Sequence, residues 1–411
     1  MHHRSVGFDE LTPGLLTTEG LILGAVAAGS DPTYPEAHIR FIDLHDGYFG
    51  RVLRAVTADE RFEILHEVGT VDYRRVLAQL QEERAAYARC AEADIALLGE
   101  LAATPDATPR HRLLAQAACD YDDSLVAIDP QALAALKWPA QSVALPAWDW
   151  ALPARMRRAA DPHPALMFWT LAIAQAFKFW TLNPDGSIQR YVGHDGKTGT
   201  AAIFSTLARL WGDEALTPAA LRMLDWTAAS VDDHFNRPPL SDRRAAMLRE
   251  GLSGRRLVEI ADYLLAQAER GFLGVTHAAA IARRLPEGYA PADPYLKKAQ
   301  LLVGAAVGFL NSRGWRIETD LTAMADYQVP RVLRALGVLR YSAALAQQVD
   351  AGVPLAAGGP EEAAIRAATV RACEQLAARH GVAAALVDAV VWSSQDVAGD
   401  ARFHLTETDF Y

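Results

Sequence analysis

The chain has few cysteines, no long apolar run and no excess of basic side chains. Its three cysteines, Cys90, Cys119 and Cys373, are widely spaced among 411 residues, which fits neither a disulfide framework nor a zinc site. No apolar run approaches the roughly 20 residues of a membrane span. The net charge of −10 argues against a nucleic-acid-binding surface, since such a surface carries a basic excess. We therefore expect a cytoplasmic protein without a membrane span or direct nucleic-acid contacts.

Signals for other common functions are missing as well. The first residues, Met1–Ser5, lack the apolar core of a signal peptide. The segment His194–Gly199 lacks the full spacing of a nucleotide-triphosphate loop and follows a hairpin rather than a parallel strand. Asp232, Asp233 and His234 have a metal-like composition, but adjacent residues on a helix face different directions. We expect neither a metal nor a cofactor.

The sequence divides into two parts at a predicted linker, Thr104–Pro109, which is rich in turn-forming residues. Before it, helical periodicity is strong over 57–67 and again over 73–103. We therefore expect residues 1–105 to form a helical extension of unknown role. Residues 110–411 form the second domain, and half of the whole chain is apolar, enough to bury a sizeable core.

The second domain is predicted to be mainly α-helical with one small β-hairpin. Helices are expected near 110–119, from about Pro164 to Ala176, and over most of the chain to about Val390. The hairpin has strands over Phe177–Leu182 and Ser187–Val192, because Asn183–Gly186 between them is a typical turn sequence.

The segment from Met324 to Ser342 carries the most chemical information. Pro330 fits only the first turn of a helix, where its missing N–H is not needed. Apolar side chains then recur at helical spacing, which predicts one buried face: Val329, Val332, Leu333, Leu336 and Leu339. Asp326 therefore lies at the helix start, where the macrodipole and free N–H groups favour a carboxylate. Such a residue can be an ordinary helix cap or can stabilise a positive charge during catalysis.

Several motifs in the same order resemble the queuosine salvage proteins, the queuosine-5′-phosphate N-glycosidases. Met324 to Ser342 resembles the family's Phe-Ala-Asp-Tyr-Arg-Val-Pro-Gln-x-Leu followed by Leu-Gly-x-Leu-x-Tyr-Ser. Further similar segments, over about residues 120–411, are Phe177–Trp180, Pro239–Arg244, Gly271–Leu273, Tyr295–Leu302 and Phe403–Tyr411. A shorter likeness links the Asp326 segment to the catalytic Val-Asp-Thr-His-x-x-Arg-Val of helix-hairpin-helix DNA glycosylases. The resemblance implies a multi-helix bundle similar to those glycosylases.

The resemblance also implies roles for individual residues. Asp326 would stabilise the ribosyl cation that forms when the base leaves, or would attack C1′. Residues implied to bind a nucleotide substrate are Lys297, Phe177, Phe179, Trp180, Tyr327, Gly199 and Tyr411. Alternatives stay open: Lys297 and Lys298 can form a solvated helix surface, and each aromatic residue can be core. Trp392 is interpreted as core packing.

Two positions depart from the family pattern. Ala176 replaces an Asn, and Gln328 replaces an Arg, so one polar group and one charge are lost. Three functions therefore stay in view: release of queuine from queuosine 5′-monophosphate or a related nucleotide, a nucleic-acid base glycosylase, and a noncatalytic helical binding protein.

Overall fold

The computed structural model describes residues 108–137, 144–183 and 185–411, together with the backbone of five strands between residues 14 and 68. The first two strands pair in one antiparallel sheet, β1 (Gly14–Leu16) with β2 (Ile22–Gly24). The other three form a second antiparallel sheet, β3 (His38–Phe41), β4 (Gly50–Ala55) and β5 (Phe62–Val68).

The prediction of a helix over 57–67 is wrong at residues 62–67, which belong to strand β5. Strand β5 pairs with β4 in antiparallel register, from Gly50 opposite Val68 to Ala55 opposite Phe62. Its sequence, Phe-Glu-Ile-Leu-His-Glu-Val, also shows period-two alternation over its first three residues, and pairing with a neighbouring strand decides between the two periods. The helix predicted over 73–103 and most of the linker lie outside the described residues.

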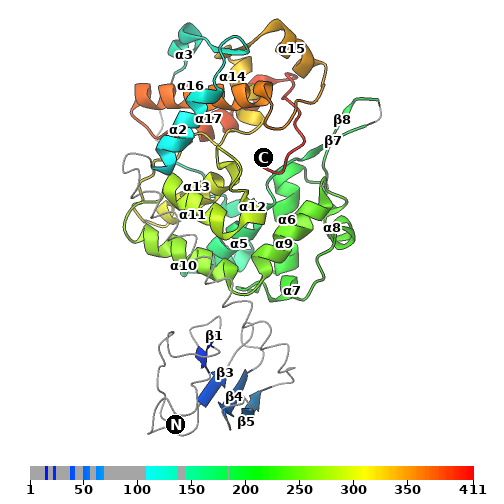
Figure 1. The fold of residues 1–411 in the computed structure, drawn as a ribbon, viewed down its shortest axis with the longest axis vertical. Coiled ribbons are helices and arrows are strands. Elements are labelled where there is room, and N and C mark those ends of the chain that lie inside the picture. The colour runs from blue at the N-terminus through cyan, green and yellow to red at the C-terminus, as the bar shows by residue number, and fades with distance from the viewer. Residues whose placement is uncertain are drawn as a thin grey trace.

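From residue 108 onward the chain is mainly helical, as predicted (Figure 1). The helices are α2 (Pro109–Asp120), α3 (Pro130–Ala135), η2 (Asp149–Ala151), α4 (Ala154–Arg158), α5 (His163–Ala174), α6 (Gly199–Trp211), α7 (Ala219–Arg222), α8 (Ala228–Phe235), α9 (Ser241–Leu252), α10 (Arg256–Ala268), α11 (Val275–Arg284), α12 (Pro286–Tyr289), α13 (Lys297–Asn311), α14 (Gln328–Ala335), α15 (Ala343–Asp350), α16 (Pro360–His380), α17 (Ala384–Ser393) and η3 (Gln395–Ala398).

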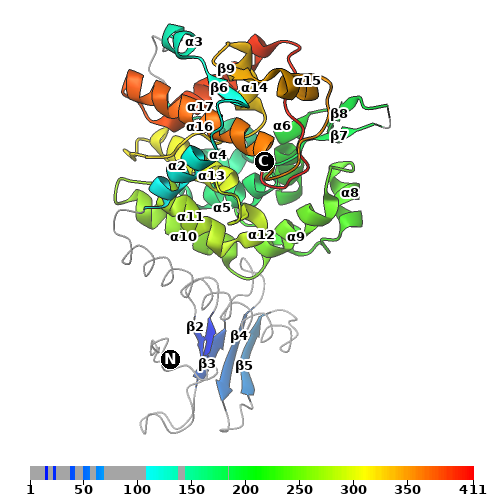
Figure 2. The same ribbon diagram turned by 45° about the horizontal axis from the view of Figure 1, so that its top comes forward.

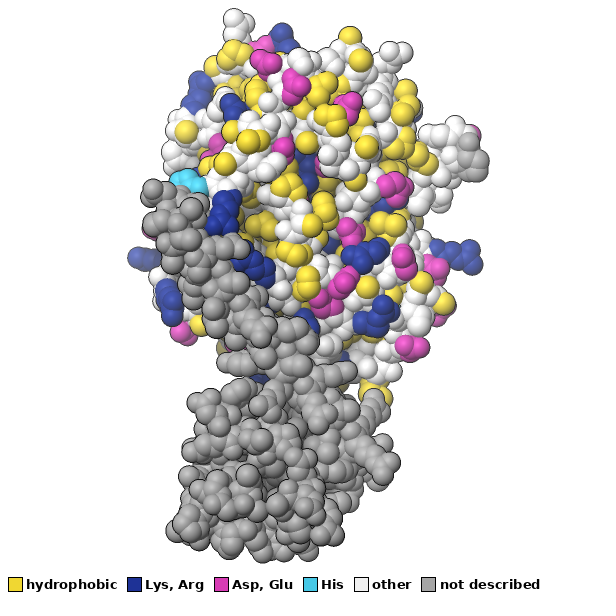
Figure 3. Space-filling model, viewed as in Figure 1, with side chains coloured by type: hydrophobic (Ala, Val, Ile, Leu, Met, Phe, Trp, Pro, Cys, Tyr) yellow, Lys and Arg dark blue, Asp and Glu magenta, His cyan; other side chains and the backbone are white. Residues whose placement is uncertain are grey.

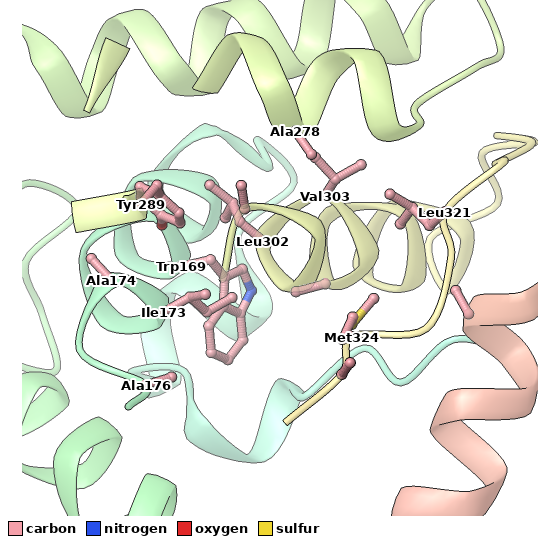
Figure 4. Packing of buried hydrophobic residues seen from close by; sticks show 14 of the residues in the cluster. Trp169, Ile173, Ala174, Ala176, Ala278, Tyr289, Leu302, Val303, Leu321 and Met324 are labelled. Atoms are coloured by element: carbon pink, nitrogen blue, oxygen red, sulfur yellow. The ribbon is translucent and has the colours of Figure 1, made fainter. Parts of the chain in front are cut away.

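Helix α5 forms the centre of this domain. Every residue from Pro164 to Ala174 is buried, and the helix packs against α10, α13 and α9. Figure 4 shows Trp169 and Ile173 of α5 beside Leu302 of α13, with Met324 nearby. A helix that is apolar all round needs neighbours on every side, which explains its central place. It also brings the start of α13 close to the chain that follows α5.

Two small sheets complete the domain, one more than the sequence predicts. The expected hairpin is present but shorter: β7 (Trp180–Leu182) pairs with β8 (Ile188–Arg190), and both protrude from the body (Figure 2). The additional sheet pairs β6 (Val126–Ile128) with β9 (Leu339–Tyr341). Leu339 therefore belongs to a strand rather than to the buried face of α14, which ends at Ala335.

Helices α16 and α17 pack against each other, and α17 carries residues that line the cavity described below. In the described part of the chain, no single helix has the length and apolar character of a membrane span. Only α16 and α17 taken together do so, across a bend of 110°. On the face seen in Figure 3, acidic and basic side chains are mixed, and neither charge forms a continuous patch.

Candidate active site

Asp326 lies at the start of α14, as predicted. Its Oδ1 atom accepts hydrogen bonds from the backbone N–H groups of Gln328, at 2.7 Å, and Val329, at 3.0 Å. Its Oδ2 atom accepts no hydrogen bond from the described residues. The side chain is 8% exposed, and this exposure faces a cavity that Asp326 helps to line. One oxygen therefore caps the helix and the other remains available to a ligand.

Lys297 is buried and lines the same cavity, so its interpretation as a solvated surface residue is wrong. It is the first residue of α13, and its Nζ atom donates a hydrogen bond to the carbonyl of Ala176 at 3.3 Å. Burial lowers the pKa of Lys297, while the nearby carboxylates of Asp326, Asp388 and Asp293 oppose that shift. The site thus holds an ammonium group close to carboxylates in surroundings of low polarity.

Asp388 of α17 completes the charged group, and sequence reasoning missed it. Its Oδ1 atom accepts the backbone N–H of Met324 at 3.0 Å. Burial, together with the charge of Asp326, raises the pKa of Asp388 to about 7. The available signal was a lone carboxylate in the otherwise apolar run of α17, because a buried carboxylate needs a partner or a function.

The cavity has a volume of about 380 Å³, and aromatic residues form part of its wall. Among its lining residues are Trp148, Trp150, Phe179, Trp180, Tyr327, Trp392, Phe403 and Tyr411. Trp392 is 38% exposed and Trp150 is 58% exposed, so the prediction that Trp392 is core is wrong. The ring of Trp148 lies 6.5 Å from that of Trp392. This volume and wall suit a flat heteroaromatic ligand.

Phe177 does not line the cavity. It is buried between two cations, with the guanidinium of Arg244 at 4.1 Å and the ammonium of Lys298 at 4.7 Å from its ring centre. The predicted strand over 177–179 is wrong, because Lys178 adopts φ 36° and β7 begins only at Trp180. Phe177 and Phe179 consequently have different surroundings, and only Phe179 reaches the cavity.

Lys298 is also buried, contrary to the prediction of a surface residue. Its Nζ atom lies 3.3 Å from the carbonyl oxygen of Ala174, to which it donates a hydrogen bond. Burial lowers its pKa to about 7. Lys298 therefore helps to hold the last residue of α5, while Lys297 lines the cavity.

Three further predicted residues, Gly199, Tyr327 and Tyr411, do line the cavity. Gly199 opens α6 with φ 57°, a conformation that favours glycine. The ring of Tyr327 stacks on that of Phe403, with centroids 4.7 Å apart. Tyr411 donates its hydroxyl hydrogen to Glu362 at 2.7 Å, and its backbone oxygen accepts the N–H of Lys178 at 3.0 Å. The segment ending at Tyr411 thus forms part of the wall.

Both departures from the family pattern are at the cavity. The carbonyl of Ala176 receives the hydrogen bond of Lys297, so a backbone group provides a polar contact there. The side chain of Gln328 accepts a hydrogen bond from Arg331 at 3.2 Å. Arg331 in turn donates to the carbonyls of Ala401 and Gly399. An arginine does border the cavity, Arg190 of β8.

The part of the chain that matches a known protein family contains several of these site residues. Residues 294–411 match the queuosine salvage protein family. The predicted resemblance is confirmed over this segment, which contains Lys297, Asp326, Asp388 and Tyr411. Similar proteins include queuosine 5′-phosphate N-glycosylase/hydrolases from two organisms. That of Sphaerobacter thermophilus is 35% identical over 189 residues, and that of Dictyostelium discoideum is 36% identical over 85 residues.

The similarity to these relatives is partial in both directions. The first alignment covers 42% of this chain and 58% of the relative, and the second covers 20% of this chain and 26% of the relative.

Within the described residues, no group of three or more His, Cys, Asp or Glu side chains could hold a metal ion.

Proposed function

We propose that this protein hydrolyses the N-glycosidic bond of queuosine 5′-monophosphate, or of a closely related 7-deazaguanine nucleotide. The product would be queuine, available again for tRNA modification. The observation that carries the proposal is the Asp326 carboxylate, fixed at a helix start and directed at an aromatic cavity together with Lys297. The names of the two similar proteins support the same reaction.

The position of Asp326 supports this chemistry. Departure of the base leaves positive charge on C1′ and on the ring oxygen of the ribose. A carboxylate stabilises this charge far better in a dry cavity than in water. The same oxygen, Oδ2, can instead form a bond to C1′, as in retaining glycosidases, and water then releases the ribose. The two routes differ in whether a covalent intermediate forms.

Asp388 provides a proton-bearing group in the same cavity. Queuine lacks N7, so the common route of acid assistance to a purine is absent. With a pKa raised to about 7 by burial and by Asp326, Asp388 is partly protonated at neutral pH. A protonated Asp388 avoids repulsion with Asp326 and can donate a hydrogen bond to the substrate.

The aromatic wall and Arg190 supply the remaining recognition. A 7-deazaguanine is flat and can stack on rings such as those of Trp148 and Trp392. Arg190, an exposed cation beside the cavity, can attract the 5′-phosphate. Arg331 is less suited to that task because it already binds two backbone carbonyls.

The proposal includes an architecture similar to that of helix-hairpin-helix DNA glycosylases. Its support is that Asp326, like the catalytic Asp of those enzymes, precedes a helix. Free nucleotide remains the preferred substrate over DNA, because the chain is acidic and one face of the molecule lacks a basic patch (Figure 3). The cytoplasm is the proposed compartment.

The substrate class can be tested with a panel of four compounds: queuosine 5′-monophosphate, queuosine, guanosine 5′-monophosphate and a queuosine-containing oligoribonucleotide. Release of base is followed by mass spectrometry. We expect queuine from the first compound at the highest kcat/KM. Faster release from the oligoribonucleotide would instead identify a nucleic-acid glycosylase, and no release from any compound would contradict the proposal.

A further inference from the structure

Arg366, in the first half of α16, is a buried residue behind the cavity wall. It is 1% exposed and does not belong to the cavity lining. Its guanidinium contacts three elements of the site. Its Nε atom donates to the carbonyl of Ala325 at 3.1 Å, and its Nη2 atom pairs with Oδ1 of Asp293 at 2.9 Å. Its Nη1 atom lies 3.7 Å from Oε1 of Glu362.

Each of these three contacts leads to a different residue of the cavity. Ala325 immediately precedes Asp326. Asp293 accepts the backbone N–H of Lys297 at 2.8 Å through its Oδ2 atom, and so fixes the start of α13. Glu362 accepts the hydroxyl hydrogen of Tyr411 at 2.7 Å. A single side chain therefore joins the segments that carry the proposed charge-stabilising carboxylate, the ammonium group and one aromatic wall.

We propose that Arg366 is a positioning residue, which sets the separation of the Asp326 carboxylate from the Lys297 ammonium without touching the substrate. This inference rests on the proposed function of the site. Placement errors of about 1 Å around reacting groups can reduce turnover by about a hundredfold, so a connection of this kind affects catalysis more than binding.

The chemistry of the guanidinium explains why arginine is required here. It is planar and directs its donors outward in several directions, whereas lysine offers one compact nitrogen. The rings of Tyr295 and Tyr411 lie 4.6 and 4.7 Å from its central carbon and help to hold it. Burial opposes its charge, but Asp293 and Glu362 outweigh that effect and raise the pKa of Arg366 above its usual range. A lysine would keep the charge but could not hold Ala325 and Asp293 in their present places.

The test compares Arg366→Lys with Arg371→Lys, a matched control in the same helix. Arg371 stacks on Tyr121, with its guanidinium carbon 4.5 Å from the ring centre, and neither residue lines the cavity. Thermal unfolding establishes that each variant is folded, and steady-state kinetics use queuosine 5′-monophosphate. For Arg366→Lys we expect kcat to fall about ten- to a hundredfold while KM changes by less than about threefold. Arg371→Lys should keep both constants.

A folded Arg366→Lys variant with unchanged kcat, or with a change in KM alone, would overturn the proposal. If Arg366→Lys does not fold, Asp293→Asn replaces it. Asn can still accept the N–H of Lys297 but forms no ion pair with Arg366, so kcat should again fall more than KM rises. Normal kcat in folded Asp293→Asn would equally overturn the proposal.

A second readout needs no substrate and separates this inference from the proposed reaction. The charge of Asp326 contributes to the raised pKa of Asp388, so displacement of Asp326 should move the titration of Asp388, measured by NMR on carboxyl-labelled protein. If the proposed reaction is wrong, wild type releases no queuine, yet Arg366→Lys still shifts this titration. If the positioning role is wrong, wild type is active and the titration is unchanged in Arg366→Lys.

Discussion

The Asp388→Asn variant should gain stability relative to wild type as the pH rises. Burial and the charge of Asp326 raise the pKa of Asp388 from 3.8 to about 7. The unfolded chain therefore releases this proton near pH 4, whereas the folded protein keeps it until about pH 7. Between these values the folded state binds more protons, so the contribution of Asp388 to stability declines as pH rises.

The magnitude follows from the size of the shift. About three pKa units correspond to about 4 kcal/mol, an upper limit because the site can relax. Asn does not titrate in this range, and its Oδ1 atom can still accept the N–H of Met324. The difference in unfolding free energy between Asp388→Asn and wild type should therefore grow between pH 4 and pH 7 and then level off.

Urea denaturation at pH 4, 6 and 8 measures this difference. Asp350→Asn is a suitable control of opposite sign, because hydrogen bonds from Arg334 lower the pKa of Asp350. Because a lowered pKa stabilises the folded state only where the carboxylate is ionised, Asp350→Asn should destabilise the protein more at pH 8 than at pH 4. A pH-independent difference for Asp388→Asn, or one that favours wild type more strongly at pH 8, would refute the assignment of a raised pKa to Asp388.

Further predictions concern the cation, the aromatic wall and the first part of the chain. Lys297→Met should lower kcat/KM by about ten- to a hundredfold, the scale of a charge-assisted hydrogen bond. Folded Lys298→Met should keep kcat/KM within about threefold of wild type. Equal losses of kcat/KM in the two variants would contradict the different roles assigned to the two lysines. Trp150→Ala should raise KM about fivefold if this exposed ring stacks on the base, since such contacts contribute about 1 kcal/mol, and an unchanged KM would exclude stacking there. Deleting residues 1–105 should leave a folded protein that binds queuosine 5′-monophosphate, which thermal melting, size-exclusion chromatography and calorimetry can check; an insoluble product would mean that the two parts share a core.

Local signals were sufficient for the elements that depend on neighbouring residues. Asp326 and Pro330 marked the start of α14, because a carboxylate cap and a first-turn proline both have a local physical cause. The turn Asn183–Gly186 marked the hairpin for the same reason. The helix predicted from about Pro164 to Ala176 forms as α5, over His163–Ala174.

Features that depend on distant segments were not predicted from local patterns. Strand β6 pairs with β9, far along the chain, and nothing in either short segment specifies its partner. Asp388 and Arg366 reach the site from α17 and α16 through tertiary packing. Phe177 and Phe179 have similar local patterns, but the backbone turn at Lys178 separates them.

The burial of Lys298 shows that a local pattern can also give a wrong prediction when distant segments decide the outcome. Two adjacent lysines at a helix start usually lie on a solvated surface. Here the carbonyls of Ala174, the last residue of α5, and of Ala176, just after it, accept hydrogen bonds from Lys298 and Lys297. These acceptors become available only after α5 and α13 have packed together.

The central claim concerns the role of Asp326 in breaking the glycosidic bond. Asn at this position can still accept the N–H groups of Gln328 and Val329, so helix capping is preserved. The decisive measurement is queuine release from queuosine 5′-monophosphate by wild type and by Asp326→Asn, with matched unfolding curves. We expect release by wild type and a loss of at least about a hundredfold in the folded variant, the scale for removing a group that stabilises a transition state. A folded Asp326→Asn protein that releases queuine at the wild-type rate would contradict the claim.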